Sequence, residues 1–448
     1  MLRLDLSEAA AVLDAELIGE NLVVEGVSTD TRAVRPQNLF VALVGDRFDG
    51  HAFVTAAAER GASAAAVMRE VEAPLPMLRV ADTRLALGEL ARAWRQRFDI
   101  PLVGVTGSNG KTTVKEMTAA ILALQGPVHA TRGNLNNDIG VPLTLFELGA
   151  EHQAAVIEMG ANHAGEIARL TDIARPTVAV ITNAGPAHLE GFGSIEGVAH
   201  AKGEIFSGLG PQGTAVINAD DAWAGLWQAL AAGRTRIHFG TGPDADVQVR
   251  RQAEGEGSRL HLRTPWGAFE TLLPLPGAHN ALNAAAATAC ALAAGATPEM
   301  AAEGLARVQG VQGRLQPRSG VRGCRLVDDS YNANPASLDA ALDWLATRPG
   351  RHWLLLGDMG ELGEEGLALH AAMGRRARES GVERLYGLGE QAAAAVEAFG
   401  PGAVWQADRD VLVERLREEL AEDVWLLVKG SRFMRLEEIV AALAGGER

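Results

Sequence analysis

The segment with the clearest chemical signature is GSNGKTT (residues 107–113), which follows the apolar run PLVGVT and leads directly into a helical pattern. Glycines let the backbone curl so that its N–H groups point at phosphate oxygens, and the start of a helix adds a favourable dipole. Lys111 has the reach to contact terminal phosphates, and the Thr112 hydroxyl can bind Mg²⁺. We therefore predict a site for a nucleoside triphosphate and Mg²⁺, formed by Gly107, Ser108, Asn109, Gly110, Lys111, Thr112 and Thr113.

The loop departs from the general pattern G-x-x-x-x-G-K-[ST], because Val105 occupies its first position. Its glycines stand instead at Gly104, Gly107 and Gly110. The alternative interpretation is a tight strand–helix turn that carries its lysine by chance. The order of strand, glycines, lysine, two threonines and helix favours nucleotide binding. It does not indicate whether the base of the nucleotide is adenine or guanine.

Candidate metal ligands follow the next apolar runs. Glu158 ends AAVIE, where a buried acid is costly unless it binds a metal or forms a salt bridge, and we predict that it binds Mg²⁺. His188 lies in a Gly/Pro-rich loop after TVAVITN, at the sheet edge where ligands gather, although a solvated loop histidine fits equally well. Lys202 lies on an amphipathic helical pattern, and its spacing alone indicates only a surface lysine.

The elements that position these residues fall into three blocks, predicted as domains over residues 1–98, 99–313 and 314–448. The first has short apolar runs and a helical pattern over 83–98, which indicates a small mixed α/β domain. The second alternates apolar runs with helices, which predicts a parallel sheet, and polar alternation after Phe239 predicts added antiparallel hairpins. The third is predicted to be a Rossmann-like, doubly wound α/β domain. The Gly-rich segment 308–314 is a candidate hinge about which the third domain closes.

Composition narrows the class of protein. The 448 residues fit about three domains of ~150 residues, and 47% hydrophobic with 22% charged residues excludes disorder as the main state. The net charge of −15 disfavours nucleic-acid binding. Two cysteines make neither a disulfide framework nor a metal cluster. There is no secretory signal pattern, and the uncharged stretch 281–300 indicates an interior helix, so we expect a cytoplasmic protein without a membrane span.

Segments in all three blocks together resemble the Mur ligases of peptidoglycan synthesis. They are GVTGSNGKTT, GNLNNDIGVPLTL, AAVIEMGANHAGEI, ITNAGPAHLEGFGS, AHAKGEI, LPGAHNALNAAAA and VDDSYNANPASL. The resemblance implies a cytoplasmic, monomeric, three-domain acid–D-amino-acid ligase that uses ATP and Mg²⁺. The second and last segments are most typical of members that join D-alanyl-D-alanine to UDP-N-acetylmuramoyl-tripeptide through an acyl phosphate. The first domain would bind the UDP end, the central domain ATP, and the third domain the amino substrate and part of the nucleotide.

The resemblance also implies residue roles. Lys111, Glu158, His188 and Lys202 would be catalytic, with Thr112, Glu158 and His188 around Mg²⁺. Lys202 matches the family lysine that CO₂ converts into a carbamate, an anionic metal ligand, and this reverses its interpretation as a surface residue. Asn280 would contact adenine, and Arg314 and Asp328 the nucleotide phosphates and ribose. Implied substrate contacts are Ser28, Asp30, Arg32, Asn134, Asn137, Asn332, Asn334 and Lys429.

Three alternatives stay open. The chain could be a sibling amide ligase, such as the tripeptide-forming Mur ligase or a folylpolyglutamate synthase, although the D-N-P-R motif of the former is absent. It could be a P-loop kinase or regulatory ATPase that forms no amide. It could also be an inactive scaffold, against which the intact set of candidate catalytic residues argues.

Overall fold

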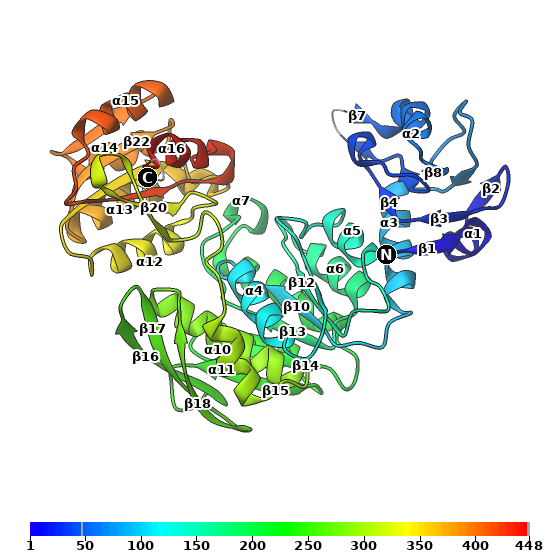
Figure 1. Cartoon of the computed structure of the whole chain (residues 1–448), viewed down its shortest axis with the longest axis horizontal. Coiled ribbons are helices and arrows are strands. Elements are labelled where there is room, and N and C mark those ends of the chain that lie inside the picture. The colour runs from blue at the N-terminus through cyan, green and yellow to red at the C-terminus, as the bar shows by residue number, and fades with distance from the viewer. Residues whose placement is uncertain (46–47, 446–448) are drawn as a thin grey trace.

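The computed structural model describes residues 1–45 and 48–445 and arranges them around three main β-sheets (Figure 1). We call the parts of the chain around these sheets the first unit (1–98), the central unit (99–313) and the third unit (314–445). The first and third units stand apart at the two upper corners of Figure 1, and the central unit lies below and between them. No helix of the described residues is long and apolar enough to cross a membrane.

The first unit is a small mixed α/β structure, as predicted. Its five-stranded sheet has the order β2-β9-β8-β5-β4, antiparallel at β2 and parallel elsewhere. These strands are β2 (Glu16–Ile18), β9 (Met77–Arg79), β8 (Ala64–Val67), β5 (Leu39–Val41) and β4 (Val27–Ser28). Two antiparallel pairs accompany it, β1 (Arg3–Asp5) with β3 (Val23–Glu25) and β6 (Val44–Gly45) with β7 (Phe48–Asp49). Its helices are α1 (Leu6–Leu13), α2 (Val54–Glu59) and α3 (Thr83–Arg95), with short 3-10 turns at Thr31–Ala33 and Gly50–Phe53.

The central unit contains a nine-stranded sheet in the order β11-β12-β10-β13-β14-β15-β16-β17-β18. Pairing is parallel from β11 to β16 and antiparallel from β16 to β18, which confirms a parallel sheet extended by hairpins. In chain order the strands are β10 (Leu102–Thr106), β11 (Val128–Ala130), β12 (Ala154–Glu158), β13 (Val178–Ile181), β14 (Thr214–Asn218), β15 (Thr235–Gly240), β16 (Val247–Glu254), β17 (Gly257–Thr264) and β18 (Gly267–Leu273).

Helices cover both faces of the parallel part of this sheet, which is why its strands read as continuous apolar runs. Strand β10, for example, is buried at all of its positions, whereas β17 alternates between buried and exposed side chains. The helices are α4 (Lys111–Leu122), α5 (Gly140–Phe146), α6 (Glu166–Ala174), α7 (Leu189–Phe192), α8 (Ile195–Gly203), α9 (Ala224–Leu230), α10 (Ala278–Ala293) and α11 (Pro298–Ala306), with a 3-10 turn at Glu204–Gly208.

The third unit has a six-stranded sheet in the order β19-β20-β24-β21-β22-β23, parallel except for β19. Its strands are β19 (Gln316–Ser319), β20 (Arg325–Asp329), β21 (Arg351–Gly357), β22 (Val382–Leu388), β23 (Ala403–Gln406) and β24 (Val424–Lys429). Apolar clusters on opposite faces contain residues of α12 (Pro335–Leu345), α13 (Gly366–Glu379) and α14 (Ala392–Phe399) on one side, and of α15 (Arg409–Glu419) and α16 (Glu437–Leu443) on the other. The doubly wound prediction is therefore confirmed. Further 3-10 turns lie at Val321–Gly323, Gly363–Glu365 and Arg432–Met434.

The units differ in how they join. One apolar cluster runs continuously from the first unit into the central unit, from Leu4 and Trp94 to Leu145 and Ile173. Polar contacts reinforce that junction, because the Trp94 indole donates to the carbonyl of Leu148 (3.2 Å) and Arg84 pairs with Asp138. The apolar clusters of the third unit contain only its own residues. Among the described residues, the third unit therefore shares no hydrophobic core with the other two.

Candidate active site

The phosphate loop lies between the end of β10 and the start of α4, as the sequence predicts. Gly110 has a φ of +82°, a left-handed conformation that favours glycine, and a Cβ there would lie 2.4 Å from the Asn283 side chain. The Lys111 ammonium folds back over the loop and donates to the carbonyl of Gly107 at 2.6 Å. Asn183 holds the loop from the neighbouring strand end, since its side-chain oxygen accepts the Asn109 N–H at 2.9 Å. Contacts within the protein thus fix the conformation of the phosphate loop.

Burial lowers the pKa of Lys111, and the charge of Arg314 acts in the same direction. The nearby carboxylate of Glu158 opposes this shift and favours the ammonium form. A triphosphate at the loop would act as Glu158 does, because an opposite charge favours the charged form of an amine. A bound phosphate would therefore stabilise the charged form of Lys111.

Glu158 ends β12 and is almost fully buried, at 3% exposure. One carboxylate oxygen accepts a hydrogen bond from the Asn136 amide at 2.9 Å. The other oxygen is buried without a hydrogen-bond partner among the described residues. A buried carboxylate oxygen with no partner is costly, and oxygen ligands of this kind suit Mg²⁺. The residues present therefore fit a bound Mg²⁺ ion.

A cavity of about 1030 Å³ brings together most of the predicted site residues at the carboxyl edge of the central sheet, facing the third unit. Predicted residues that line it are Ser108, Asn109, Gly110, Lys111, Thr113, Asn134, Asn137, Glu158, His188, Asn280, Arg314, Asn332, Asn334 and Lys429. Predicted residues outside its lining are Gly107, Thr112, Lys202, Asp328, Ser28, Asp30 and Arg32. Thr112 still adjoins it, because its hydroxyl accepts a hydrogen bond from Arg314 at 2.9 Å.

Helical spacing alone indicates that Lys202 is a surface lysine, and the structure shows that it is buried. Its side chain is 1% exposed on α8, and its ammonium lies 5.2 Å from the centre of the Phe192 ring. Burial, followed by repulsion from Lys111, lowers the pKa of Lys202 to about 7. An amine with this pKa is substantially uncharged near neutral pH, which is the nucleophilic form. A surface lysine would have neither property.

His188 directly precedes α7 and has a left-handed backbone conformation, with φ of +55°. Its Nδ1 lies 2.5 Å from a carboxylate oxygen of Glu361, which belongs to the third unit. This pair lowers the pKa of Glu361 through the hydrogen bond to His188. The histidine is thus more than a solvated loop residue, because its side chain is only 25% exposed and contacts a carboxylate across the junction between two units.

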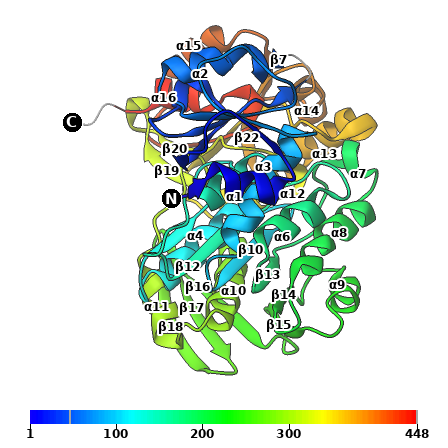
Figure 2. The ribbon, with the colours of Figure 1, turned by 90° about the vertical axis from the view of Figure 1, so that its right-hand side faces the viewer.

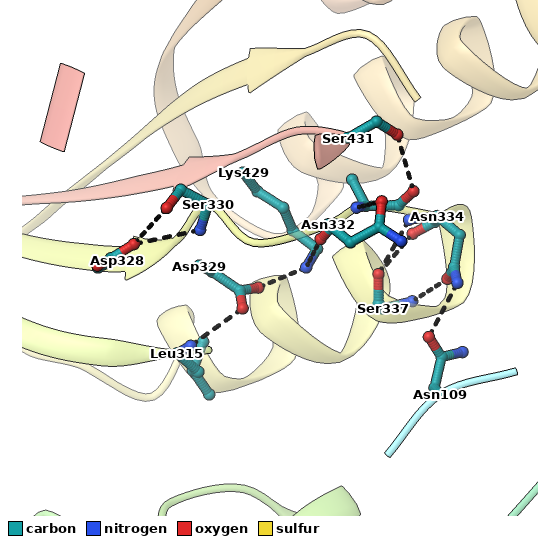
Figure 3. A network of polar contacts seen from close by, with 11 residues as sticks. Asn109, Leu315, Asp328, Asp329, Ser330, Asn332, Asn334, Ser337, Lys429 and Ser431 are labelled. Carbon is teal, nitrogen blue, oxygen red and sulfur yellow. Dashed lines mark hydrogen bonds and ion pairs between the residues drawn. The ribbon is translucent and has the colours of Figure 1, made fainter. Parts of the chain in front are cut away.

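Asp328, a predicted nucleotide contact, is not among the residues that line the cavity. Asp328 and Asp329 are consecutive on β20, so their side chains point to opposite faces. Asp328 accepts from the Ser330 hydroxyl at 2.6 Å, and Asp329 pairs with Lys429 (Figure 3). Asp329 lines the cavity, whereas Asp328 is not among its lining residues. The acid that this strand presents to the cavity is therefore Asp329.

Lys429 lines the cavity, but its ammonium forms hydrogen bonds with residues of its own unit. It donates to Asp329 at 2.6 Å and to the carbonyl of Asn332 at 3.1 Å (Figure 3). Burial raises the pKa of Asp329, although Lys429 opposes the shift. We therefore assign Lys429 a role in holding Asp329 and the 330–334 loop in place.

The Asn332–Asn334 segment connects the third unit to the phosphate loop. Asn334 caps α12 in a reciprocal pair with Ser337. Its free amide then donates to the Asn109 side chain at 2.8 Å, across the junction between units (Figure 3). The predicted pair Asn134 and Asn137 also lines the cavity, and the Asn137 side-chain oxygen accepts the N–H of Gly140, the first residue of α5, at 2.8 Å.

Ser28, Asp30 and Arg32 do not join this site. Asp30 forms an ion pair with Arg32 at 2.7 Å, and Ser28 donates to the Asp30 carbonyl at 2.9 Å. They form a local turn of the first unit, next to the strand β4 that carries Ser28. The structure therefore leaves their predicted contact with a substrate without support from the cavity.

Sequence reasoning missed several lining residues, namely Asn136, His279, Asn283, Tyr331 and Arg432. Tyr331 lies between two arginines, with Arg314 4.5 Å and Arg432 5.5 Å from its ring centre. Asn280 is held by the carbonyl of Pro276 at 2.7 Å, and Asn283 is one helical turn further along α10. The three-residue spacing of these asparagines was a signal that a helix would present both on one face.

Comparison with known proteins places this site in a family. Family models described as "Mur ligase family, catalytic domain", "Mur ligase middle domain" and "Mur ligase, glutamate ligase domain" match residues 23–95, 105–291 and 313–432. The chain is 46% identical to the UDP-N-acetylmuramoyl-tripeptide--D-alanyl-D-alanine ligase of Escherichia coli (strain K12), with 99% of each chain covered.

Solved structures agree with the sequence matches. A crystal structure of MurF from Acinetobacter baumannii superposes with a TM-score of 0.93 at 36% identity and covers 98% of each chain. MurF ligase from Thermotoga maritima in complex with ADP gives a TM-score of 0.84 at 29% identity, over 94% of this chain and 97% of that one.

Proposed function

The chain belongs to the Mur ligase family, and we propose that it joins D-alanyl-D-alanine to UDP-N-acetylmuramoyl-tripeptide at the expense of ATP. The product, UDP-N-acetylmuramoyl-pentapeptide, is a building block of peptidoglycan. The observation that carries this proposal is the cavity that joins the phosphate loop and Glu158 to the Asn332–Asn334 segment of the third unit. It brings residues of the central unit and of the third unit to the walls of one cavity. Full-length similarity to enzymes named for this reaction supports the choice of substrates.

The chemistry starts from a carboxylate, which is a poor electrophile. Its oxygen attacks the γ-phosphorus of ATP, the bond to the β-phosphate oxygen breaks, and an acyl phosphate and ADP result. The amine of D-alanyl-D-alanine then attacks the acyl carbon, the C–O bond to phosphate breaks, and the amine loses one proton. The products are the amide, ADP and inorganic phosphate.

Residues of this chain would stabilise the negative charge that develops in those steps. The loop N–H groups and Lys111 hold the phosphates, and preorganised donors of this kind stabilise a transferring phosphoryl group. Glu158, Thr112 and His188 would hold Mg²⁺, which when bound neutralises phosphate charge and lessens the repulsion between two anions. Asn280 and Arg314 line the same cavity and are proposed nucleotide contacts, with Asp329 in place of Asp328.

We also propose that CO₂ converts Lys202 into a carbamate. The uncharged amine attacks the CO₂ carbon, a C–N bond forms, and one proton is released. The pKa of about 7 supplies that uncharged amine, because burial and repulsion from Lys111 outweigh the attraction of Glu166 and Glu204 for the ammonium. The product would turn a buried cation beside Lys111 into an anion.

The three units suggest a division of labour. We propose that residues 1–98 bind the UDP end, that 99–313 bind ATP, and that 314–448 bind the dipeptide and part of the nucleotide. An acyl phosphate hydrolyses when it is wet, so the third unit should close over the cleft before transfer. The separate core of that unit and the irregular link between α11 and β19 support such a motion. We further propose a monomeric enzyme of the cytoplasm, where its nucleotide substrates are made.

The test is phosphate release from ATP and Mg²⁺, with the two substrates added separately and together, followed by mass spectrometry of the product. Release that needs both substrates, with a mass gain of one dipeptide unit, is expected. Release without either would indicate a regulatory ATPase. Release with another amine, or another acid, would indicate a sibling ligase. Small-angle scattering that shows no compaction with nucleotide and substrate would contradict closure.

A further inference from the structure

A turn of the third unit reaches the central unit beside His188. Glu361 lies in this turn, between β21 and α13, and its carboxylate oxygen approaches His188 Nδ1 to 2.5 Å. Its carbonyl accepts the N–H of Glu190 at 3.4 Å, and its second carboxylate oxygen lies 3.5 Å from the Asn162 amide. Helix α7 accordingly lies against the third unit in both views (Figures 1 and 2). Glu361 is thus the point at which this turn meets the candidate metal site.

Both partners of this contact have unusual backbones. His188 has a φ of +55° and Glu361 a φ of +61°, in the left-handed region that non-glycine residues rarely adopt. Such conformations persist where the surrounding structure over-determines them, and they cluster at functional sites. Here the two strained residues come from different units and face each other.

The chemistry of the pair fixes the role of each ring nitrogen. A carboxylate presents only lone pairs, so its close contact with Nδ1 favours the ring form that carries the proton on Nδ1. In the neutral ring Nε2 then carries the free lone pair. Histidines that bind metals usually donate their other N–H to a carboxylate or carbonyl, which sets the tautomer and the ring orientation. From this geometry we infer that Glu361 is a positioning residue that directs His188 Nε2 toward the Mg²⁺ site.

A second contact fixes the imidazole from another side. The ring of Phe192 packs edge-on against His188, with 6.5 Å between ring centres and 87° between ring planes. The same Phe192 ring lies under the Lys202 ammonium. Glu361 therefore completes an array that runs from the third unit through His188 and Phe192 to Lys202. Because Glu361 comes from the third unit, the metal site is complete only when that unit is in place.

The inference rests on the proposed function, since it takes His188 as a metal ligand. The experiment is calorimetric titration of a non-hydrolysable ATP analogue into the full-length protein, with and without Mg²⁺. It compares the wild type, Glu361→Ala, Glu361→Gln and the control Glu364→Ala. Glu364 is exposed in the same turn and has no ion pair or side-chain hydrogen bond in the part of the chain that the structure describes. The measured quantity is the gain in nucleotide affinity on adding Mg²⁺.

We expect Glu361→Ala to reduce this gain by about 10- to 100-fold, the usual effect of losing a residue that orients a metal ligand. Affinity without Mg²⁺ should be unchanged. Glu361→Gln, whose amide oxygen can accept from Nδ1, should keep most of the gain, and Glu364→Ala should match the wild type. In a His188→Ala background, Glu361→Ala should add no further loss.

Two results would overturn the inference. One is a Glu361→Ala protein with the full Mg²⁺-dependent gain. The other is an equal loss of affinity with and without Mg²⁺, which would mean that Glu361 only holds the units together. A wild-type protein whose nucleotide affinity ignores Mg²⁺ would instead overturn the proposed metal site, and with it the inference that depends on that site.

Discussion

Replacing Lys429 by methionine tests whether this lysine holds the cleft wall rather than a substrate. Its ammonium lies 2.6 Å from Asp329, and the two side chains are only 3% and 12% exposed. The substitution leaves the Asp329 carboxylate buried, with the N–H of Leu315 as its remaining partner at 3.0 Å. Removing one partner of a buried ion pair costs about 3–5 kcal/mol, so we expect a loss of stability of that size in the third unit.

The loss should depend on pH in a defined direction. Burial already raises the pKa of Asp329 in the folded protein, and removing Lys429 takes away the attraction that opposes this shift. A carboxyl group with a raised folded pKa favours folding only while it is protonated. Its contribution is present below the unfolded pKa of about 3.9 and is lost as pH rises through the folded value. The penalty of Lys429→Met should therefore be smallest in acid and grow toward neutral pH.

The assay is urea unfolding of the full chain, with hydrogen exchange of β20 and β24 to locate the transition that changes. Multi-domain proteins need this second readout because a single unfolding free energy is not defined for them. Asp329→Asn combined with Lys429→Met removes both charges and should cost much less than Lys429→Met alone. Arg325→Met, an exposed change on β20, should stay within about 0.5 kcal/mol. The reasoning fails if Lys429→Met costs less than 1 kcal/mol at neutral pH, or if the double variant is the least stable.

Other variants test the remaining parts of the site. Lys202→Ala should nearly abolish turnover, with partial rescue by short carboxylates, and wild-type activity would contradict the carbamate. Lys202→Met in CO₂-free buffer should raise the melting temperature most below pH 7, where the buried amine is charged, with the gain fading toward pH 10 as the lysine becomes neutral in both states. Asn334→Ala removes a helix cap and the bond to Asn109, so it should cost about 1 kcal/mol and raise KM for nucleotide; an unchanged KM would show that the bond does not order the loop.

The sheets were predictable because their sequence patterns are local. Continuous apolar runs such as VAVI at β13 indicate strands covered on both faces, and alternation in β17 indicates a hairpin with one exposed face. The phosphate loop was predictable for the same reason, since strand, glycines and helix are contiguous. Its position at the carboxyl edge then follows from the parallel arrangement, which also brings Glu158 and His188 to the same cavity.

The parts that local sequence patterns did not reveal depend on packing between distant segments. The burial of Lys202 follows from how α8 lies in the central unit, which helical spacing does not reveal. Two adjacent aspartates on β20 give no sign of which one faces the cleft, because that depends on which face of the sheet the cleft lies over. The His188–Glu361 pair joins residues 173 positions apart in separate units, and no local pattern marks it.

The absence of a shared core between the third unit and the other two has a consequence for how the cleft responds to temperature. The side-chain contacts across the junction described above are polar, as in Asn109–Asn334, Arg314–Thr112 and His188–Glu361. Burial of apolar surface is what gives association a large negative heat capacity change. An opening that exposes little apolar surface therefore has an enthalpy nearly constant with temperature. The logarithm of the opening equilibrium constant should therefore change almost linearly with inverse temperature, whereas the fused first and central units keep the strongly curved stability profile of a hydrophobic core.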